Sequence, residues 1–167
     1  MKRPAVIGTL AGVYVAAGIF FLLVFGFEVR ISSGVFEVDS PSRLPGLAIA
    51  LVKPCLAFLG AAAILRGGPR AWWVAVLLPV YLMAPHLHAM VLAPHRAAQY
   101  GPPRQGLSSY YGQRIAFSLL YGLPIPILLR RRVRGYFGLD QSPRFLTAGI
   151  VVLAVALVLV WSGVARL

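Results

Sequence analysis

The stretch FLTAGIVVLAVALVLVWSGVA, residues 145–165, contains no Asp, Glu, Lys or Arg. About 20 apolar residues in a helix are enough to cross the ~30 Å hydrocarbon layer of a bilayer. This stretch therefore predicts a transmembrane helix. Three more stretches have the same apolar character and length, at residues 5–27, 44–65 and 71–93.

The composition of the whole chain agrees with this interpretation. Hydrophobic residues make up 59% of the 167 positions and charged residues 12%, whereas soluble domains carry about 25% charged residues. The sequence predicts an all-α, polytopic integral membrane bundle, with residues 1–167 as one membrane domain. The single cysteine, Cys55, lies in an apolar run and has no second cysteine with which to form an internal disulfide.

A fifth span is predicted at residues 109–129, where the helix is broken. Gly122, Pro124 and Pro126 interrupt it, and the apolar part alone is short for a crossing. A start near residue 109 gives enough length and places Arg114 at the membrane interface, where its long side chain can reach the headgroups. The alternative is four spans plus a short or re-entrant segment.

Positive charge predicts the orientation. The chain has 16 Lys and Arg residues against 4 Asp and Glu, a net charge of +12. These basic residues flank apolar segments, as the positive-inside rule requires, which argues against nucleic acid as a partner. Five spans put the N-terminus and residues 130–144 in the cytoplasm, and residues 28–43, residues 94–114 and the C-terminus outside. Four spans with the N-terminus outside also satisfy the charge bias. We expect a multi-pass protein of a bacterial-type cytoplasmic (inner) membrane.

The first span and its neighbours carry several local signals. Residues 5–27 are too long an apolar core for a signal peptide and predict an uncleaved anchor. Gly8, Gly12 and Ala16 form a small-residue stripe that predicts close helix packing inside the molecule, with a dimer motif as the alternative. The alternating residues around Ser33-Gly34 allow either a hairpin or an irregular loop. Trp72 and Trp73 are typical of an interfacial aromatic belt.

Lys53 is the most unusual residue of the predicted spans. It lies about nine residues into its helix, or roughly 13 Å, too deep for its amine to reach the interface of a centred helix. A charge at that depth costs about 2.5–3.5 kcal/mol, so such residues face a partner or a wet cavity. All four acids lie in predicted loops. Lys53, Tyr81 and Arg114 are therefore candidates to bind an anion, a lipid phosphate or a partner subunit. The alternative is a neutral or water-solvated lysine.

A possible metal site lies in residues 83–90. Met83, His86 and Met90 share one helix face at spacings of three and four residues, and thioether with imidazole suits Cu(I). His88 points to another face and is a possible additional ligand. Haem would need a second histidine-bearing helix or another ligand, and the other spans have no histidine. In the alternative interpretation, these histidines bond backbone carbonyls near Pro79 and Pro85.

A basic cluster follows the broken span. Anionic lipid headgroups attract such clusters on the cytoplasmic side of a membrane. Topogenic charge alone also explains them. The residues predicted to meet lipid headgroups are Arg130, Arg131, Arg132 and Arg134.

The sequence predicts no enzyme. No acid lies in a span, and the chain has no Gly-x-Ser-x-Gly, His-Glu-x-x-His or phosphate-binding glycine loop. We expect a non-catalytic accessory subunit or assembly partner of a membrane complex, with other membrane subunits and anionic lipids as partners and no cofactor. The alternatives are a protein that binds copper, haem or quinone through residues 83–90, and a small transporter or channel lined by Lys53 and residues 122–126.

Overall fold

The computed structural model describes residues 5–35, 44–139 and 142–164. Every regular element in these ranges is a helix, which confirms the predicted all-α class. The helices are α1 (Ala5–Val35), α2 (Leu44–Arg66), α3 (Pro69–Tyr100), α4 (Leu107–Gly122), α5 (Pro124–Leu128), α6 (Arg131–Tyr136) and α7 (Pro143–Val164).

Three of the described helices are long and apolar enough to cross a membrane. The segments are Ala5–Phe27, Pro69–Tyr100 and Pro143–Ser162. At 1.5 Å per residue, the 32 residues of α3 measure about 48 Å, more than the ~30 Å hydrocarbon layer. The fold is therefore that of a membrane protein. The predicted count of five crossings is not confirmed by these three helices.

Two predicted connections are partly helical. α1 continues to Val35, so no strand begins at Val29 and the hairpin prediction is wrong there; residues 36–43 lie outside the described ranges. α3 continues through Pro94 to Tyr100, beyond residue 93, where the predicted span ends. A proline removes one donor from a helix and leaves the carbonyl four residues earlier unpaired. That carbonyl belongs to Met90, and the Tyr111 hydroxyl donates to it over 3.4 Å.

The chain divides into two compact units. The first comprises residues 1–78 and 136–138, and the second comprises residues 79–135 and 139–167. The boundary falls inside α3, between Leu78 and Pro79.

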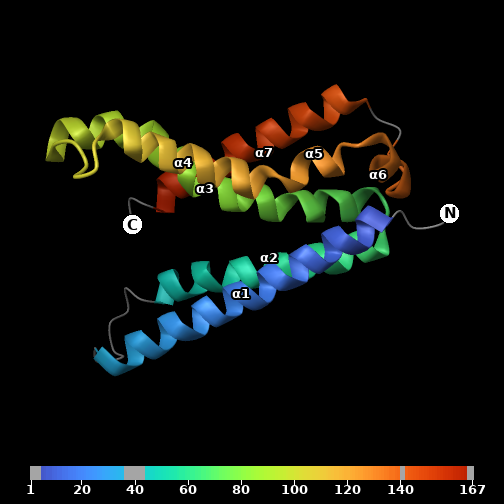
Figure 1. Cartoon of the computed structure of the whole chain (residues 1–167), viewed down its shortest axis with the longest axis horizontal. Coiled ribbons are helices and arrows are strands. Elements are labelled where there is room, and N and C mark those ends of the chain that lie inside the picture. Colours follow the sequence, from blue (N-terminus) through green and yellow to red (C-terminus); the bar gives the residue numbers. More distant parts are fainter. Residues whose placement is uncertain (1–4, 36–43, 140–141, 165–167) are drawn as a thin grey trace. The chain divides into compact units, whose positions relative to one another are not determined.

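In the first unit α1 and α2 run side by side in opposite directions (Figure 1). Glycines let aromatic rings fill the contact from both sides. A Cβ atom at position 60 would lie 2.6 Å from Cδ1 of Tyr14, and one at position 18 would lie 2.9 Å from the ring of Phe58. Both distances are too short for a side chain. Each ring therefore occupies the space that a glycine on the opposite helix leaves open.

Tyr14 also donates a hydrogen bond to a carbonyl group that a proline leaves unpaired in α3. Pro79 has no N–H group, so the carbonyl of Ala75 loses its helical donor. The Tyr14 hydroxyl donates to that carbonyl oxygen over 2.6 Å, and the whole side chain is only 1% exposed. Water is scarce inside a membrane, so an internal partner is needed for such a carbonyl.

The small-residue stripe of α1 faces away from the rest of the first unit. Gly8, Gly12 and Ala16 are exposed, and a Cβ atom at either glycine would meet nothing within 4 Å. The stripe therefore makes no helix contact within the first unit, and its packing elsewhere inside the molecule stays a prediction. α1 uses a face with larger side chains instead, whose members Ile7, Leu10, Ala11 and Tyr14 are buried.

The two tryptophans at the start of α3 differ in burial. Trp72 is 0% exposed and belongs to the core of the first unit. The place of the pair at the membrane interface stays a prediction. Trp73 is half-buried and meets the Trp72 ring edge-on, with 4.9 Å between ring centres.

Candidate functional site

The densest group of polar and aromatic side chains in the second unit lies between α3 and α4. These two helices lie side by side at this point (Figure 1). Residues spaced by three, four, seven or eight positions share one face of a helix. On α4 the residues with this spacing are Tyr110, Arg114, Phe117, Ser118 and Tyr121. His86 of α3 meets this face.

His86 is in contact with α4 through ring stacking and a hydrogen bond to Arg114. Its ring centre lies 5.2 Å from that of Phe117 and 5.5 Å from that of Tyr121, with interplanar angles of 20° and 26°. Its Nδ1 lies 3.3 Å from Nη1 of Arg114. Because a guanidinium group only donates hydrogen bonds, Nδ1 is the acceptor. His86 is therefore assigned as the neutral tautomer that carries its proton on Nε2.

Arg114 and Ser118 contribute two hydrogen-bond donors that lack acceptors. The guanidinium carbon of Arg114 lies over the ring of Tyr110, 5.0 Å from its centre. Nε of Arg114 and Oγ of Ser118 are buried, and neither has a hydrogen-bond partner among the described residues. The two residues are one helical turn apart. Together they offer donors to a group with acceptor oxygens, such as a carboxylate or a phosphate.

The sequence supplies no such acid nearby. From residue 44 to residue 139 the chain has no Asp or Glu. Among the residues whose side chains the structure describes, Arg114 therefore has no acidic neighbour that could neutralise its charge. An arginine inside a membrane usually pairs with a carboxylate, backbone carbonyls or a wet cavity.

His88 forms a second polar link in this unit, from α3 to α7. Its Nδ1 lies 3.0 Å from Oγ of Ser162, and that hydroxyl donates to the carbonyl of Val158 over 2.9 Å. Because the hydroxyl proton is used, Nδ1 of His88 is the donor in the other bond. The lone pair of Nε2 is then buried, and it has no hydrogen-bond partner among the described residues.

The residues of the predicted copper site have other contacts in the structure. The sulfur of Met83 lies 3.2 Å from where a Cβ atom of Gly122 would be, so this side chain packs against α4. The Nδ1 lone pair of His86 faces Arg114. The described residues contain no cluster of three or more His, Cys, Asp or Glu side chains that could hold a metal ion. Binding of copper or haem by Met83, His86, His88 and Met90 stays a prediction.

The other predicted binding residues lie apart from this group or in different surroundings. Lys53 is half-buried in α2 of the first unit. Tyr81, in the second unit, packs against Trp161, with 6.1 Å between ring centres. Of the three residues predicted to bind a ligand or partner, Arg114 lies in the α3–α4 polar group, and the roles of Lys53 and Tyr81 stay predictions.

In the arginine cluster near α6, Arg134 forms a hydrogen bond to the backbone. Nε of Arg134 donates to the carbonyl of Leu129 over 3.1 Å, just beyond the end of α5. Arg130, Arg131 and Arg132 are exposed. Contact of the cluster with lipid headgroups stays a prediction.

The sequence interpretation did not assign Ser118, Ser162, Phe117 or Tyr121 to a site. The sequence does contain a signal for Ser118, Phe117 and Tyr121. Ser118 is four residues after Arg114, and Tyr121 is four residues after Phe117, so each pair shares a face of α4. Ser162 gives no comparable signal, since its partner His88 lies 74 positions away.

Comparisons with protein-family models, with curated proteins and with solved structures gave no match for this chain. The fold and the site define its class: an all-helical membrane protein with an arginine-centred polar group between two of its helices.

Proposed function

We propose that this chain is a non-catalytic membrane subunit that assembles with another integral membrane protein through Arg114. A carboxylate on a helix of the partner would pair with the guanidinium group of Arg114, which is only partly buried. The observation that carries the proposal is the pair of buried donors without acceptors on one face of α4. The absence of any acid from residue 44 to residue 139 supports it, because no carboxylate from that stretch can pair with Arg114.

Electrostatics favours such a pairing. A well-placed carboxylate would form charge-assisted hydrogen bonds with the guanidinium group, which are stronger than hydrogen bonds between neutral groups. His86 and Tyr110 already fix the guanidinium group from two directions. Less conformational entropy is therefore lost when the partner binds.

The test is extraction of the complex in a mild detergent and measurement of its mass. The native chain is expected in a complex larger than one subunit. Arg114→Gln should lower the recovery of that complex at least about tenfold, because the partner carboxylate would be left buried without its charge partner. Arg104→Gln is the matched control, since Arg104 is exposed in the turn before α4. A native chain that is monomeric in mild detergent and in membrane cross-linking would contradict the proposal, as would an Arg114→Gln complex of native yield.

We further propose five membrane crossings, with the N-terminus and residues 130–144 in the cytoplasm. Helices α4 and α5 together extend from residue 107 to residue 128, which is long enough for the fourth crossing even with a break at Leu123. The positive-inside rule supports this orientation.

Cysteine labelling would measure the topology. In a Cys55→Ala background, Gln105→Cys and Ser142→Cys are expected to react from opposite sides of the membrane, because one crossing separates them. Both positions are exposed in the structure. Labelling of both from the same side would show that α4 and α5 do not cross.

A further inference from the structure

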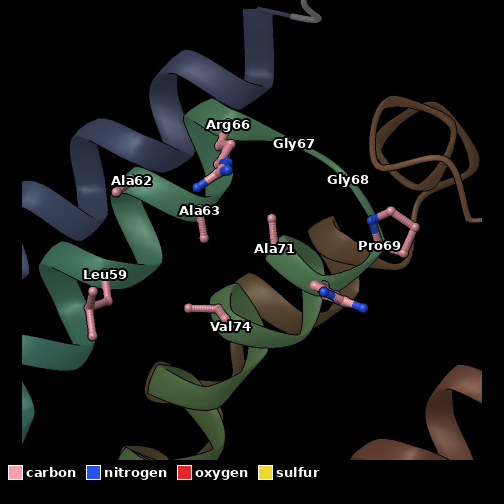
Figure 2. Close-up of a pocket in the computed structure, with 10 residues that line it drawn as sticks. Leu59, Ala62, Ala63, Arg66, Gly67, Gly68, Pro69, Ala71 and Val74 are labelled. Carbon is pink, nitrogen blue, oxygen red and sulfur yellow. The ribbon is translucent and has the colours of Figure 1, made fainter.

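A pocket of about 680 Å³ lies beside the turn between α2 and α3 in the first unit. Figure 2 shows Leu59, Ala63 and Val74 pointing into the space between the two helices, with the side chain of Arg66 at the end of α2. Arg70 also lines the pocket. The other lining residues are apolar, and Arg66 and Arg70 are the charged residues among them.

The turn that closes this pocket is held in shape. Gly67 and Gly68 have φ angles of 74° and 91°, which residues with a side chain rarely adopt. The hydroxyl of Tyr136 donates to the carbonyl of Leu65 over 2.9 Å, and the Tyr136 ring packs against Gly67. Residue 65 would otherwise be one of the unpaired carbonyls at the end of α2. The pocket is thus formed before any ligand binds.

We propose that this pocket binds one anionic glycerophospholipid. Its phosphate would lie between Arg66 and Arg70, and an acyl chain would lie along Leu59 and Val74. The volume is in the usual range of about 300–1,000 Å³ for ligand pockets. No acid between residues 44 and 139 competes for the two arginines. A zwitterionic headgroup would bring a cation to the same two charges, so the charge complementarity selects an anionic lipid.

The location in the sequence agrees with a lipid ligand. The turn joins the apolar helices α2 and α3, and the basic residues stand where the apolar residues end. In a membrane protein this is the depth of the phosphate groups, with the acyl chains beside the adjacent apolar turns. The proposal depends neither on Arg114 nor on the number of crossings.

The test is titration of the full-length chain, in phosphatidylcholine nanodiscs, with phosphatidylglycerol. Native mass spectrometry counts the lipid molecules that stay bound. We expect one tightly bound phosphatidylglycerol per chain. Each basic residue near a membrane surface contributes about 1 kcal/mol to the binding of anionic lipid. The double variant Arg66→Gln/Arg70→Gln should therefore bind phosphatidylglycerol roughly 10- to 30-fold more weakly.

Two further variants separate the pocket from general charge. Arg104→Gln/Arg144→Gln removes the same charge at two exposed positions and should leave the affinity within about threefold, since neither residue lines the pocket. Val74→Trp fills the pocket without changing its charge and should weaken binding at least about tenfold. Equal retention of phosphatidylcholine, an equal loss in the Arg104/Arg144 control, or full binding by Val74→Trp would overturn the proposal. Displacement of the lipid by inorganic phosphate would also overturn it, because the site would then be a phosphate site.

Discussion

Gly60→Leu is expected to separate α1 from α2 and to unfold the first unit under detergent conditions that the native chain survives. Even the first atom of the new side chain would have no room, because a Cβ atom at position 60 would lie 2.6 Å from Cδ1 of Tyr14. Forcing extra atoms into a packed core costs about 1–3 kcal/mol. Leucine adds three carbons beyond that Cβ atom, so its effect should be larger than that of alanine.

Tyr14 has little freedom to make space. Its hydroxyl is bonded to the carbonyl of Ala75 at 2.6 Å, and its side chain is buried. If the ring moves, that carbonyl loses its donor at a cost of about 1–3 kcal/mol. If the ring stays, α1 must move away from α2. Either outcome destabilises the unit, by about 1–3 kcal/mol or more.

Gly12→Leu is the matched control for this prediction. Position 12 is on α1, it is exposed, and a Cβ atom there would meet nothing within 4 Å. The loss should be under about 1 kcal/mol, as at most surface positions. Helix content measured by circular dichroism during SDS titration gives both stabilities. Equal destabilisation by the two variants would show that Tyr14 does not fill the space at Gly60.

The contrast between these glycines explains why the sequence predicted helices well and their packing poorly. Apolar length identifies a membrane helix, and residues 5–27 were predicted correctly as an apolar span. The face of α1 that packs against another helix could not be predicted, because nearly every side chain of α1 is apolar and no polar stripe marks the outside. The spacing of Gly8, Gly12 and Ala16 did not identify the face of α1 that packs against α2. Burial of Tyr14 depends on Gly60, which is distant in the sequence.

In the candidate site, too, the sequence indicated the residues of one helix but not their contacts with another helix. Arg114 could be singled out from the sequence because a charge close to an apolar segment is costly, and the neighbours on its own helix follow from helical spacing. Its contact with His86 could not be foreseen, because it depends on how α3 packs against α4. The spacing of Met83, His86 and Met90 described one helix by itself. The structure adds the second helix, which brings a guanidinium group to His86.

Tyr14→Phe is expected to destabilise the first unit by about 1–3 kcal/mol, although it removes a single oxygen atom. The value should lie toward the upper end of that range, since Tyr14 lies within the span Ala5–Phe27 and water is scarce there. The carbonyl of Ala75 would then have neither a helical donor, because of Pro79, nor the hydroxyl. Tyr111→Phe gives a comparison. That variant also removes the donor to a carbonyl oxygen, the one of Met90, which lies four residues before Pro94. Because this hydrogen bond is longer, at 3.4 Å, and only partly buried, the loss of stability should be smaller.

A double-mutant cycle tests whether the proline is the reason for the tyrosine. Pro79→Ala restores an N–H group that can bond to the carbonyl of Ala75 within α3, so Tyr14→Phe should cost less in that background than in the native chain. The difference between the two costs is the coupling energy, which should be about 1 kcal/mol or more for residues that share one acceptor. SDS titration of the native chain, the two single variants and the double variant supplies the four stabilities. Pro79→Ala also leaves some empty volume in the core. The stability lost in this way is the same with Tyr14 and with Phe at position 14, so it cancels from the coupling energy. If Tyr14→Phe costs the same in both backgrounds, the hydroxyl does not serve the carbonyl that Pro79 leaves unpaired.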